Sequence, residues 1–378
     1  MSRRLLIVTP YFPPDEKAGG AEMFALTMAK GLAADHGWEV SIATTSDDEP
    51  FKTEILAERI NVYRLPYRFK LSNSPISVAW LWELRRIIND INPDVINIHL
   101  PVPGLGDIAG YVSGGRPVVI YYHFGSMKKG NWALDPLIWL YESCVLPINL
   151  RKAQRIVCGT EYVKDGILRN FRDKTVIITP GVDSARFHPA RERVTEPHVL
   201  YVGSLNQSDG HKRFPDLLEA CKILLKDIPD LRLSAIGGGD GRGTYKNLAL
   251  EMGIAESVEF LGRLEGDALA EAYRRAAVLA MPSLQETFGM VITEAMATGL
   301  PVVAVNGGGV PTLIDDCRDG LLVPPRNPSA LANALKVILS QPEKASVLGR
   351  AGRKKACERL VWSRQIAMMD MVLMGVVI

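Results

Sequence analysis

The sequence lacks several features that would place it in a common class of protein. Its 378 residues include 44 basic and 42 acidic side chains, and the formal net charge of +2 provides no general field to attract nucleic acid. Its five cysteines, Cys144, Cys158, Cys221, Cys317 and Cys357, show no paired spacing. This spacing argues against a disulfide framework and fits a reducing compartment. We therefore expect a cytoplasmic protein with no nucleic-acid partner.

Long hydrophobic runs are also missing. The longest candidate, Ala133–Leu150, is interrupted by Asp135, Glu142 and two prolines, so it does not predict a membrane span. Arg3 and Arg4 precede the apolar run Leu5–Val8, but this run is too short for a signal peptide and prolines follow it. We predict that it is the first strand of a soluble protein.

What the chain has is an alternation of short apolar segments with segments of helical period. Such alternation is typical of α/β proteins with parallel sheets. Near His188–Pro197 a charged, proline-bounded stretch interrupts the alternation, which restarts at Val199. We therefore predict two doubly wound domains, 1–187 and 188–362, which face each other across a deep cleft.

The most informative stretch runs from Pro282 to Pro311. Glu286 follows a predicted buried strand, and Glu294 lies eight residues later in a predicted helix that begins at Gly289. A helix start without side-chain bulk offers free backbone N–H groups and a positive dipole end to a phosphate. The two carboxylates on either side of it suit the hydroxyl groups of a sugar or a ribose.

This stretch resembles the Glu-x7-Glu signature of retaining glycosyltransferases of family 4, which have the GT-B fold with two Rossmann-like domains. Gly19 and Gly20 resemble the glycine loop that faces the donor phosphates in that family, and Thr179–Asp183 resembles its interdomain turn. The resemblance implies that residues 1–187 bind the acceptor and that residues 188–362 bind the nucleotide sugar. It also implies that a last helix, at about 363–378, crosses back to the first domain.

The resemblance assigns roles to individual residues. Glu294 is expected to accept the ribose hydroxyls, Glu286 to hold a hydroxyl of the transferred sugar, and Lys212 to bind the phosphates. His123 is expected to contact the donor sugar. The expected catalytic residues are Glu286, Lys212 and His123, and the expected donor-binding residues are Gly19, Gly20, Ser204, Lys212, Gly238, Arg263, Glu286, Phe288, Gly289, Met290, Val291 and Glu294.

The sequence also shapes our expectation for the leaving diphosphate. Asp47-Asp48 and Asp315-Asp316 fall in predicted surface turns, and neither forms a well-placed Asp-x-Asp pair. We therefore predict an enzyme without cofactor or metal, in which Lys212 and the helix start hold the developing charge. The family often has an arginine where this chain has Ser204. Either Arg213 or Arg263 replaces that cation, or the enzyme has one cation fewer.

Two features of the first half leave alternatives open. His99 and His123 both follow predicted strands, and we assign a function to His123 while leaving the role of His99 undecided between structure and chemistry. Residues Tyr67 to Arg86 predict an amphipathic helix with aromatic and basic flanks. This helix either packs on the sheet or docks on an anionic membrane surface.

Together these observations predict retaining transfer of a sugar from a UDP- or GDP-sugar to a hydroxyl acceptor, lipid-linked acceptors included. The expected setting is cell-surface polysaccharide or glycolipid biosynthesis, with peripheral contact to the inner face of the plasma membrane through the N-terminal domain. The alternatives are a nucleotide-sugar epimerase of the same fold and a non-catalytic nucleotide-sugar-binding scaffold. The sugar, the base and the acceptor are not identified by the sequence.

Overall fold

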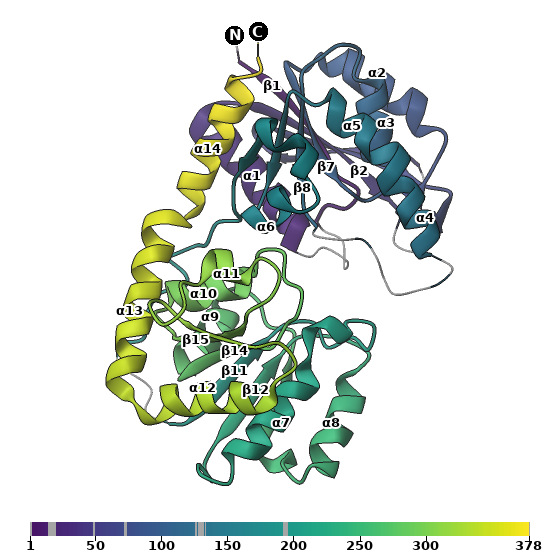
Figure 1. The fold of residues 1–378 in the computed structure, drawn as a ribbon. Coiled ribbons are helices and arrows are strands. Elements are labelled where there is room, and N and C mark those ends of the chain that lie inside the picture. The colour runs from purple at the N-terminus through teal and green to yellow at the C-terminus, as the bar shows by residue number, and fades with distance from the viewer. Residues whose placement is uncertain are drawn as a thin grey trace. The chain divides into compact units, whose positions relative to one another are not determined.

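The computed structural model describes residues 2–13, 20–47, 50–71, 74–124, 127, 132, 134–191 and 196–377. The chain forms two compact units. The first comprises Met1–Pro180 together with Ser363–Ile378, and the second comprises Gly181–Trp362. Each unit is an α/β structure around its own sheet (Figure 1).

The N-terminal unit is built on an eight-stranded sheet of order β10-β9-β8-β7-β1-β2-β4-β3. All pairs are parallel except β3 with β4 at one edge. The strands are β1 (Arg4–Val8), β2 (Glu39–Ser46), β3 (Lys52–Ala57), β4 (Ile60–Pro66), β7 (Val95–Leu100), β8 (Val118–Tyr122), β9 (Arg155–Cys158) and β10 (Thr175–Ile177), and β5 (Phe69–Leu71) pairs with β6 (Ser74–Ile76) in a separate hairpin.

Helices cover both faces of this sheet (Figure 1). They are α1 (Gly20–His36), α2 (Trp80–Ile91), α3 (Leu105–Val112), α4 (Asp135–Leu140), the π-helical turn η1 (Tyr141–Val145), α5 (Leu146–Lys152), α6 (Glu161–Asp165), η2 (Arg169–Lys174) and α14 (Trp362–Met374). Because side chains alternate along a strand, Ile96, Ile98 and Leu100 of β7 enter the core beneath α2, α3 and α5. Asn97 and His99 of the same strand therefore lie on the opposite face.

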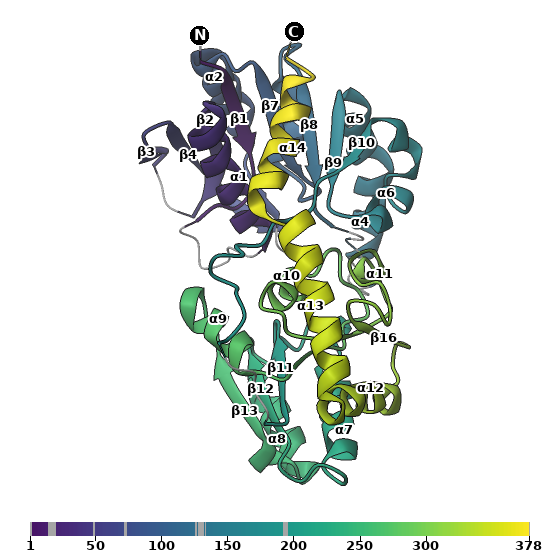
Figure 2. The same cartoon turned by 90° about the vertical axis from the view of Figure 1, so that its left-hand side faces the viewer.

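The last helix, α14, returns to the N-terminal unit (Figure 2). A Cβ at Gly31 of α1 would lie 2.3 Å from the Ile366 side chain, so the missing side chain allows the two helices to pack closely. Asp370 of α14 accepts a hydrogen bond from Trp38 Nε1 at 2.7 Å and lies 3.1 Å from His36 Nδ1. These contacts hold the returning helix against α1.

The C-terminal unit is built on a parallel six-stranded sheet of order β13-β12-β11-β14-β15-β16. The strands are β11 (His198–Val202), β12 (Arg232–Ile236), β13 (Val258–Gly262), β14 (Val278–Met281), β15 (Val302–Val305) and β16 (Leu321–Val323). The helices are η3 (Gly210–Lys212), α7 (Phe214–Leu224), α8 (Arg242–Glu251), η4 (Ala255–Ser257), α9 (Gly266–Arg275), α10 (Met290–Ala297), α11 (Val310–Leu313), α12 (Pro328–Ser340) and α13 (Pro342–Arg359).

Two hydrophobic cores lie on opposite faces of this sheet. Alternate residues of β14 enter different cores, Val278 and Ala280 with helices α7, α8 and α12, and Leu279 and Met281 with α9, α10 and α11. Burial on both faces explains why these strands are continuous apolar runs in the sequence. Among the helices built from described residues, none combines the length and the apolar character needed to cross a bilayer.

One predicted element differs from the structure. The helix expected from Tyr67 to Arg86 begins only at Trp80, because β5 and β6 form a hairpin before it. Trp80 is fully buried and donates from its indole N–H to Pro66 O at 2.9 Å, whereas Trp82 is exposed. The aromatic flank of the predicted helix thus splits between the core and the surface.

Candidate functional site

The geometry of the C-terminal unit points to the carboxyl edge of its sheet. β11 pairs with β12 on one side and with β14 on the other, so the order of the strands reverses between β11 and β14. Ligands of open α/β sheets bind at such a switch point, outside the carboxyl ends of the strands. The two loops that leave the sheet here are 203–213 after β11 and 282–289 after β14.

These two loops bring Lys212 and Glu286 together. Lys212 Nζ lies 2.7 Å from Glu286 Oε2, and the side chains are 24% and 19% exposed. A backbone hydrogen bond of 2.8 Å from Leu284 N to His211 O joins the loops directly beside this pair. The predicted phosphate-binding lysine and the predicted sugar-binding glutamate, 74 positions apart in the sequence, therefore form one ion pair.

The glycine run 307–309 supports the loop that carries Glu286. Gly309 N donates to Glu286 O at 2.6 Å, and a Cβ at Gly309 would lie 2.1 Å from Thr287 O. A Cβ at Gly308 would lie 2.5 Å from Glu286 O. A side chain at either position would displace the Glu286 loop, so these glycines are required by the close approach of two backbone segments.

Helix α10 begins beside this loop. Gly289, at the N-cap, has φ +87°, a left-handed conformation that favours glycine, and no described side chain caps the helix there. Phe288 is buried, and Met290 and Val291 occupy the first turn, where backbone N–H groups have no intrahelical acceptor. Their N–H groups and the positive dipole end make this turn suitable for an anion.

Glu294 lies in the second turn of α10. Its Oε2 accepts a hydrogen bond of 2.7 Å from Tyr273 Oη, and Tyr273 is a buried residue of α9. Burial raises the pKa of Glu294 to about 7, although the hydrogen bond from Tyr273 acts in the opposite direction. Glu294 is therefore a carboxyl group that ionises near neutral pH and whose orientation is set by a neighbouring hydroxyl.

Ser204 lies in a polar cluster of its own. Its hydroxyl donates to Asp209 Oδ2 at 2.5 Å and accepts from Asn206 Nδ2 at 2.8 Å. Gly238 lies beside this loop, because Leu205 N donates to Gly238 O at 2.9 Å, and a Cβ at Gly238 would meet open space. This part of the site thus presents a carboxylate and backbone groups.

The N-terminal unit carries the other predicted residues. Gly20 is the first residue of α1, whereas Gly19 lies outside the described residues. His123 follows β8 directly, and its Nε2 lies 3.0 Å from Nδ1 of His99. The two histidines that follow or end neighbouring strands therefore contact each other.

Comparison with known proteins shows the family of the chain. Residues 18–186 match the profile described as "Glycosyltransferase Family 4", and residues 184–355 match the profile "Glycosyl transferases group 1". The D-inositol 3-phosphate glycosyltransferase of Corynebacterium aurimucosum is 32% identical over 90% of this chain and 87% of its own length. The chain belongs to glycosyltransferase family 4.

Further relatives of this family 4 chain extend the comparison. A GDP-mannose-dependent alpha-(1-6)-phosphatidylinositol monomannoside mannosyltransferase of Mycolicibacterium smegmatis is 26% identical over 98% of both chains. The chain spans about half the length of several other curated relatives that it matches. The sucrose-phosphate synthase of Thermosynechococcus elongatus has the same fold, with a TM-score of 0.76, 23% identity and coverage of 99% of this chain and 98% of that one. The predicted GT-B fold is thereby confirmed.

The structure also shows what the two candidate replacement cations of this family 4 chain contact. Arg213 forms a two-point contact with Asp216, at 3.0 Å from Nε and 2.6 Å from one terminal nitrogen. Arg263 pairs with Glu265 at 2.7 Å, and its side chain is 61% exposed. Both guanidinium groups pair with carboxylates that are not predicted site residues, whereas the partner of Lys212 is the predicted site residue Glu286.

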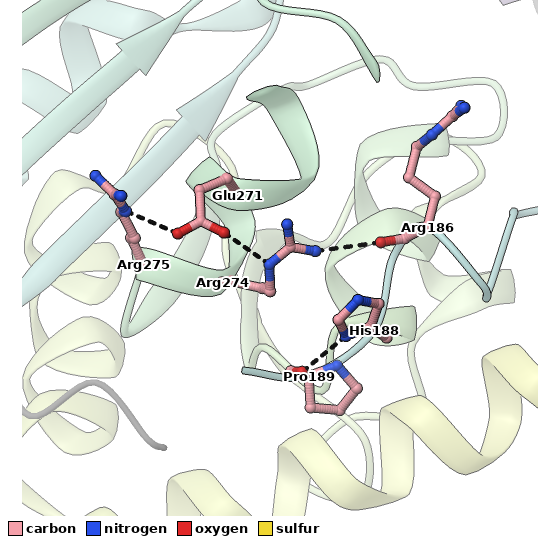
Figure 3. A network of polar contacts seen from close by, with 6 residues as sticks. All are labelled: Arg186, His188, Pro189, Glu271, Arg274 and Arg275. Atoms are coloured by element: carbon pink, nitrogen blue, oxygen red, sulfur yellow. Dashed lines mark hydrogen bonds and ion pairs between the residues drawn. The ribbon is translucent and has the colours of Figure 1, made fainter. Parts of the chain in front are cut away.

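A cavity of about 290 Å³ lies at the other edge of the same sheet. It adjoins the residues that precede β14 and β15 and is lined in part by Arg274, Arg350 and Arg353. Figure 3 shows the two hydrogen bonds that the Arg274 guanidinium group donates, to Glu271 at 2.9 Å and to Arg186 O at 3.2 Å. The cavity is thus at the amino ends of the strands, away from the carboxyl edge that carries Glu286 and Glu294.

Three residues that contact Glu294, Ser204 or His99 were not predicted from the sequence. Tyr273 orients Glu294 from α9, Asp209 contacts Ser204, and Asn97 contacts His99. Tyr273 lies 21 positions before Glu294, and no sequence spacing marks this pair. Of the three, only Asn97 could have been noticed in the sequence, because it is a polar residue inside the apolar strand β7.

Proposed function

We propose that the chain is a retaining glycosyltransferase that moves a sugar from a UDP- or GDP-sugar to a hydroxyl acceptor. The observation that carries the proposal is the Lys212–Glu286 pair at the switch point of the C-terminal sheet, next to the uncapped start of α10. A cation, a carboxylate and a helix N-terminus within one loop cluster suit a sugar joined to a diphosphate.

Each group of the C-terminal unit has a role in this proposal. An ammonium group has three N–H donors, and Glu286 is the acceptor of Lys212 Nζ among the described residues, so donors remain for phosphate oxygens. Glu286 holds a hydroxyl of the transferred sugar, and Glu294 accepts the ribose hydroxyls. The first N–H groups of α10 bind the diphosphate. The N-terminal unit supplies His123 and binds the acceptor.

The proposed reaction retains the anomeric configuration. The bond between the anomeric carbon and the diphosphate oxygen breaks, and the acceptor hydroxyl attacks the face from which the diphosphate departs. The departing phosphate oxygen takes the proton of that hydroxyl, so no covalent sugar–enzyme bond is needed. Charge grows on the diphosphate during this step, and Lys212 and the start of α10 stabilise it more strongly in the transition state than before it.

The test is an assay of donor cleavage and product formation with UDP-glucose, UDP-N-acetylglucosamine and GDP-mannose. We expect one donor to release its nucleoside diphosphate faster in the presence of a hydroxyl acceptor, with an α-linked product by NMR. Glu286→Gln is the matched variant that should lose this activity. Interconversion of the donor sugar without release would indicate an epimerase, and binding without turnover would indicate a scaffold.

We also propose that the N-terminal unit contacts a membrane that carries a lipid-linked acceptor. The consecutive helical segments α4, η1 and α5 expose an apolar surface. A second support is the name of one relative, a phosphatidylinositol monomannoside mannosyltransferase, which refers to a lipid. The exposed apolar residues of this surface are Leu137, Trp139, Leu140, Val145 and Ile148. Arg151 and Lys152 follow at the end of α5 and suit anionic lipid headgroups.

Sedimentation with vesicles of phosphatidylglycerol and phosphatidylcholine tests this surface. We expect the chain to bind the anionic vesicles and the double variant Trp139→Ser/Ile148→Ser to remain in the supernatant. Ile55→Ser, which removes an exposed apolar side chain of β3, is the control and should bind as the parent does. Equal binding of all three proteins would refute the assignment.

A further inference from the structure

Three polar side chains form a hydrogen-bonded chain on one face of the N-terminal sheet. His123 Nε2 lies 3.0 Å from His99 Nδ1, and His99 Nε2 lies 3.1 Å from Asn97 Oδ1. Asn97 Nδ2 in turn lies 3.1 Å from Val119 O of the neighbouring strand. Asn97 and His99 are buried, and His123 is half-buried. Each ring nitrogen in this chain has one position for a proton, so the donors can be assigned in order.

The assignment begins at the backbone. Val119 O is a carbonyl and only accepts, so Asn97 must direct its NH₂ group toward it and its Oδ1 toward His99. Oδ1 only accepts, so the nitrogen of His99 that faces it, Nε2, carries the proton. The orientation of the amide and the tautomer of His99 therefore follow from one strand carbonyl.

His123 is the donor in its hydrogen bond with His99. Burial lowers the pKa of His99 to about 3, so this ring is neutral near neutral pH and its Nδ1 is a bare acceptor. His123 must then donate to it from Nε2–H. Burial, and after it the neighbouring His99, also lower the pKa of His123 well below its usual range, so its second nitrogen, Nδ1, carries no proton.

The ring of His123 is also held in place. Its centroid lies 4.5 Å from that of Tyr121 and 5.8 Å from that of Phe24 in α1, with the Phe24 ring edge-on. Tyr121 is anchored by its hydroxyl, which donates to Ile178 O at 2.8 Å. His123 Nδ1 has no hydrogen-bond partner among the residues that the structure describes.

We propose that Asn97 and His99 are positioning residues that hold His123 as the Nε2–H tautomer, so that Nδ1 presents a hydrogen-bond acceptor to a hydroxyl of the substrate. The identity of the hydroxyl rests on the proposed function, whereas the tautomer of His123 does not depend on it. A histidine in the other tautomer would present a donor, which suits a carbonyl or phosphate oxygen instead. The hydrogen bonds that begin at Val119 O thus make Nδ1 of His123 an acceptor, which suits the hydrogen of a substrate hydroxyl.

The tautomer is measured directly by NMR of protein labelled with ¹⁵N-histidine, which has six histidines in all. Long-range correlations from the ring carbon protons distinguish a bare nitrogen from a protonated one. At pH 7.5 we expect His123 and His99 both to show a protonated Nε2 and a bare Nδ1. A protonated Nδ1 on His123, or a doubly protonated ring, overturns the inference whatever the activity of the enzyme.

A pair of variants tests the role of the hydrogen bonds that link Asn97, His99 and His123. His99→Phe keeps a ring at this position but removes the acceptor for His123 Nε2–H, so we expect the His123 signals to show a mixture of tautomers. His198→Phe is the control, because His198 is a paired histidine of the C-terminal unit with partners Arg275 O and Ser234. It should leave the His123 signals unchanged.

Kinetics with the best donor complete the test. We expect His99→Phe to lower kcat about tenfold, the scale of one lost hydrogen bond, while the Kd of the nucleoside diphosphate stays within about twofold. An altered tautomer with unchanged kcat would refute the role in substrate binding but leave the glycosyltransferase assignment intact. A chain that shows the expected tautomers but transfers no sugar would instead refute the proposed function.

Discussion

Replacement of Lys212 by alanine is the sharpest perturbation of the proposed site. In the structure Lys212 Nζ is 2.7 Å from Glu286, and both side chains are about one-fifth to one-quarter exposed, so the pair is partly shielded from solvent. A unit charge about 4 Å from a phosphate oxygen contributes ~4 kcal/mol at an effective dielectric constant of ~20. Partial exposure of Lys212 reduces this contribution to ~3 kcal/mol. A change of that size in the activation free energy corresponds to about a hundredfold change in rate.

We therefore expect Lys212→Ala to lower kcat by about 10²–10³-fold, which is the range found when one preorganised donor is removed. KM should change less, because the interaction strengthens as charge develops on the diphosphate. Lys212→Arg should recover part of the rate, since the guanidinium group is longer and differently shaped. Initial rates of nucleoside diphosphate release measure all of these effects.

Two controls separate the loss of the cation from its side effects. Lys212→Ala leaves the Glu286 carboxylate unpaired, and the double variant Lys212→Ala/Glu286→Gln removes this charge as well. Lys336 forms a 2.8 Å ion pair with Asp227 on the surface of the same unit, so Lys336→Ala removes a comparable pair and should leave kcat unchanged. If Lys212→Ala stays within a few-fold of the parent, the reasoning is wrong and Arg213 and Arg263 become the next candidates.

Ser204→Arg in the Lys212→Ala background tests the same idea in reverse. Its new guanidinium group would enter the cluster of Asp209 and Asn206, because Ser204 already contacts both. We expect only partial recovery, since Asp209 competes with the diphosphate for the cation.

Five further predictions concern Glu294, Glu286, metal dependence and Gly309. Because the pKa of Glu294 is raised to about 7, only about a tenth of this carboxyl group is ionised at pH 6. The affinity for the nucleoside diphosphate, measured by calorimetry, should therefore rise as the pH increases through 7. Glu294→Gln should abolish that part of the pH dependence. Because of the same raised pKa, the folded chain binds more protons than the unfolded chain between pH ~4.5 and ~7. The contribution of Glu294 to the free energy of unfolding should therefore fall as the pH rises across this window. Thermal melts of Glu294→Gln should lack this effect. Glu286→Ala should spare nucleotide binding and reduce turnover, and equal losses of both would contradict its placement on the sugar. Excess chelator should leave the transfer rate intact, and a rate restored only by manganese or magnesium would refute metal independence. Gly309→Ala should lower both thermal stability and kcat, because its Cβ would lie 2.1 Å from Thr287 O, whereas Gly253→Ala, where a Cβ meets open space, should affect stability through its left-handed backbone but spare kcat.

The order of the elements followed largely from the sequence. Strands β11, β14 and β15 are apolar runs because helices cover both faces of the sheet there, and the apolar runs 199–202, 276–281 and 302–305 of the sequence coincide with them to within two residues. The predicted helix start at Gly289 agrees with the structure, in which Gly289 is the N-cap of α10. The hairpin β5–β6 was missed, because its short strands bury too little to impose an alternating pattern.

The candidate site divides in the same way. Glu286, Glu294 and Gly289 lie within one short stretch, where spacing along a loop and a helix largely determines their arrangement. The meeting of Lys212 with Glu286 and of Tyr273 with Glu294 depended on the tertiary structure, because these partners come from different βα units that only the pairing order of the parallel sheet places side by side. The same holds for His123, whose partner His99 stands on a neighbouring strand. Sequence alone showed two histidines at strand ends, whereas the register of β7 and β8 decided that they share a hydrogen bond.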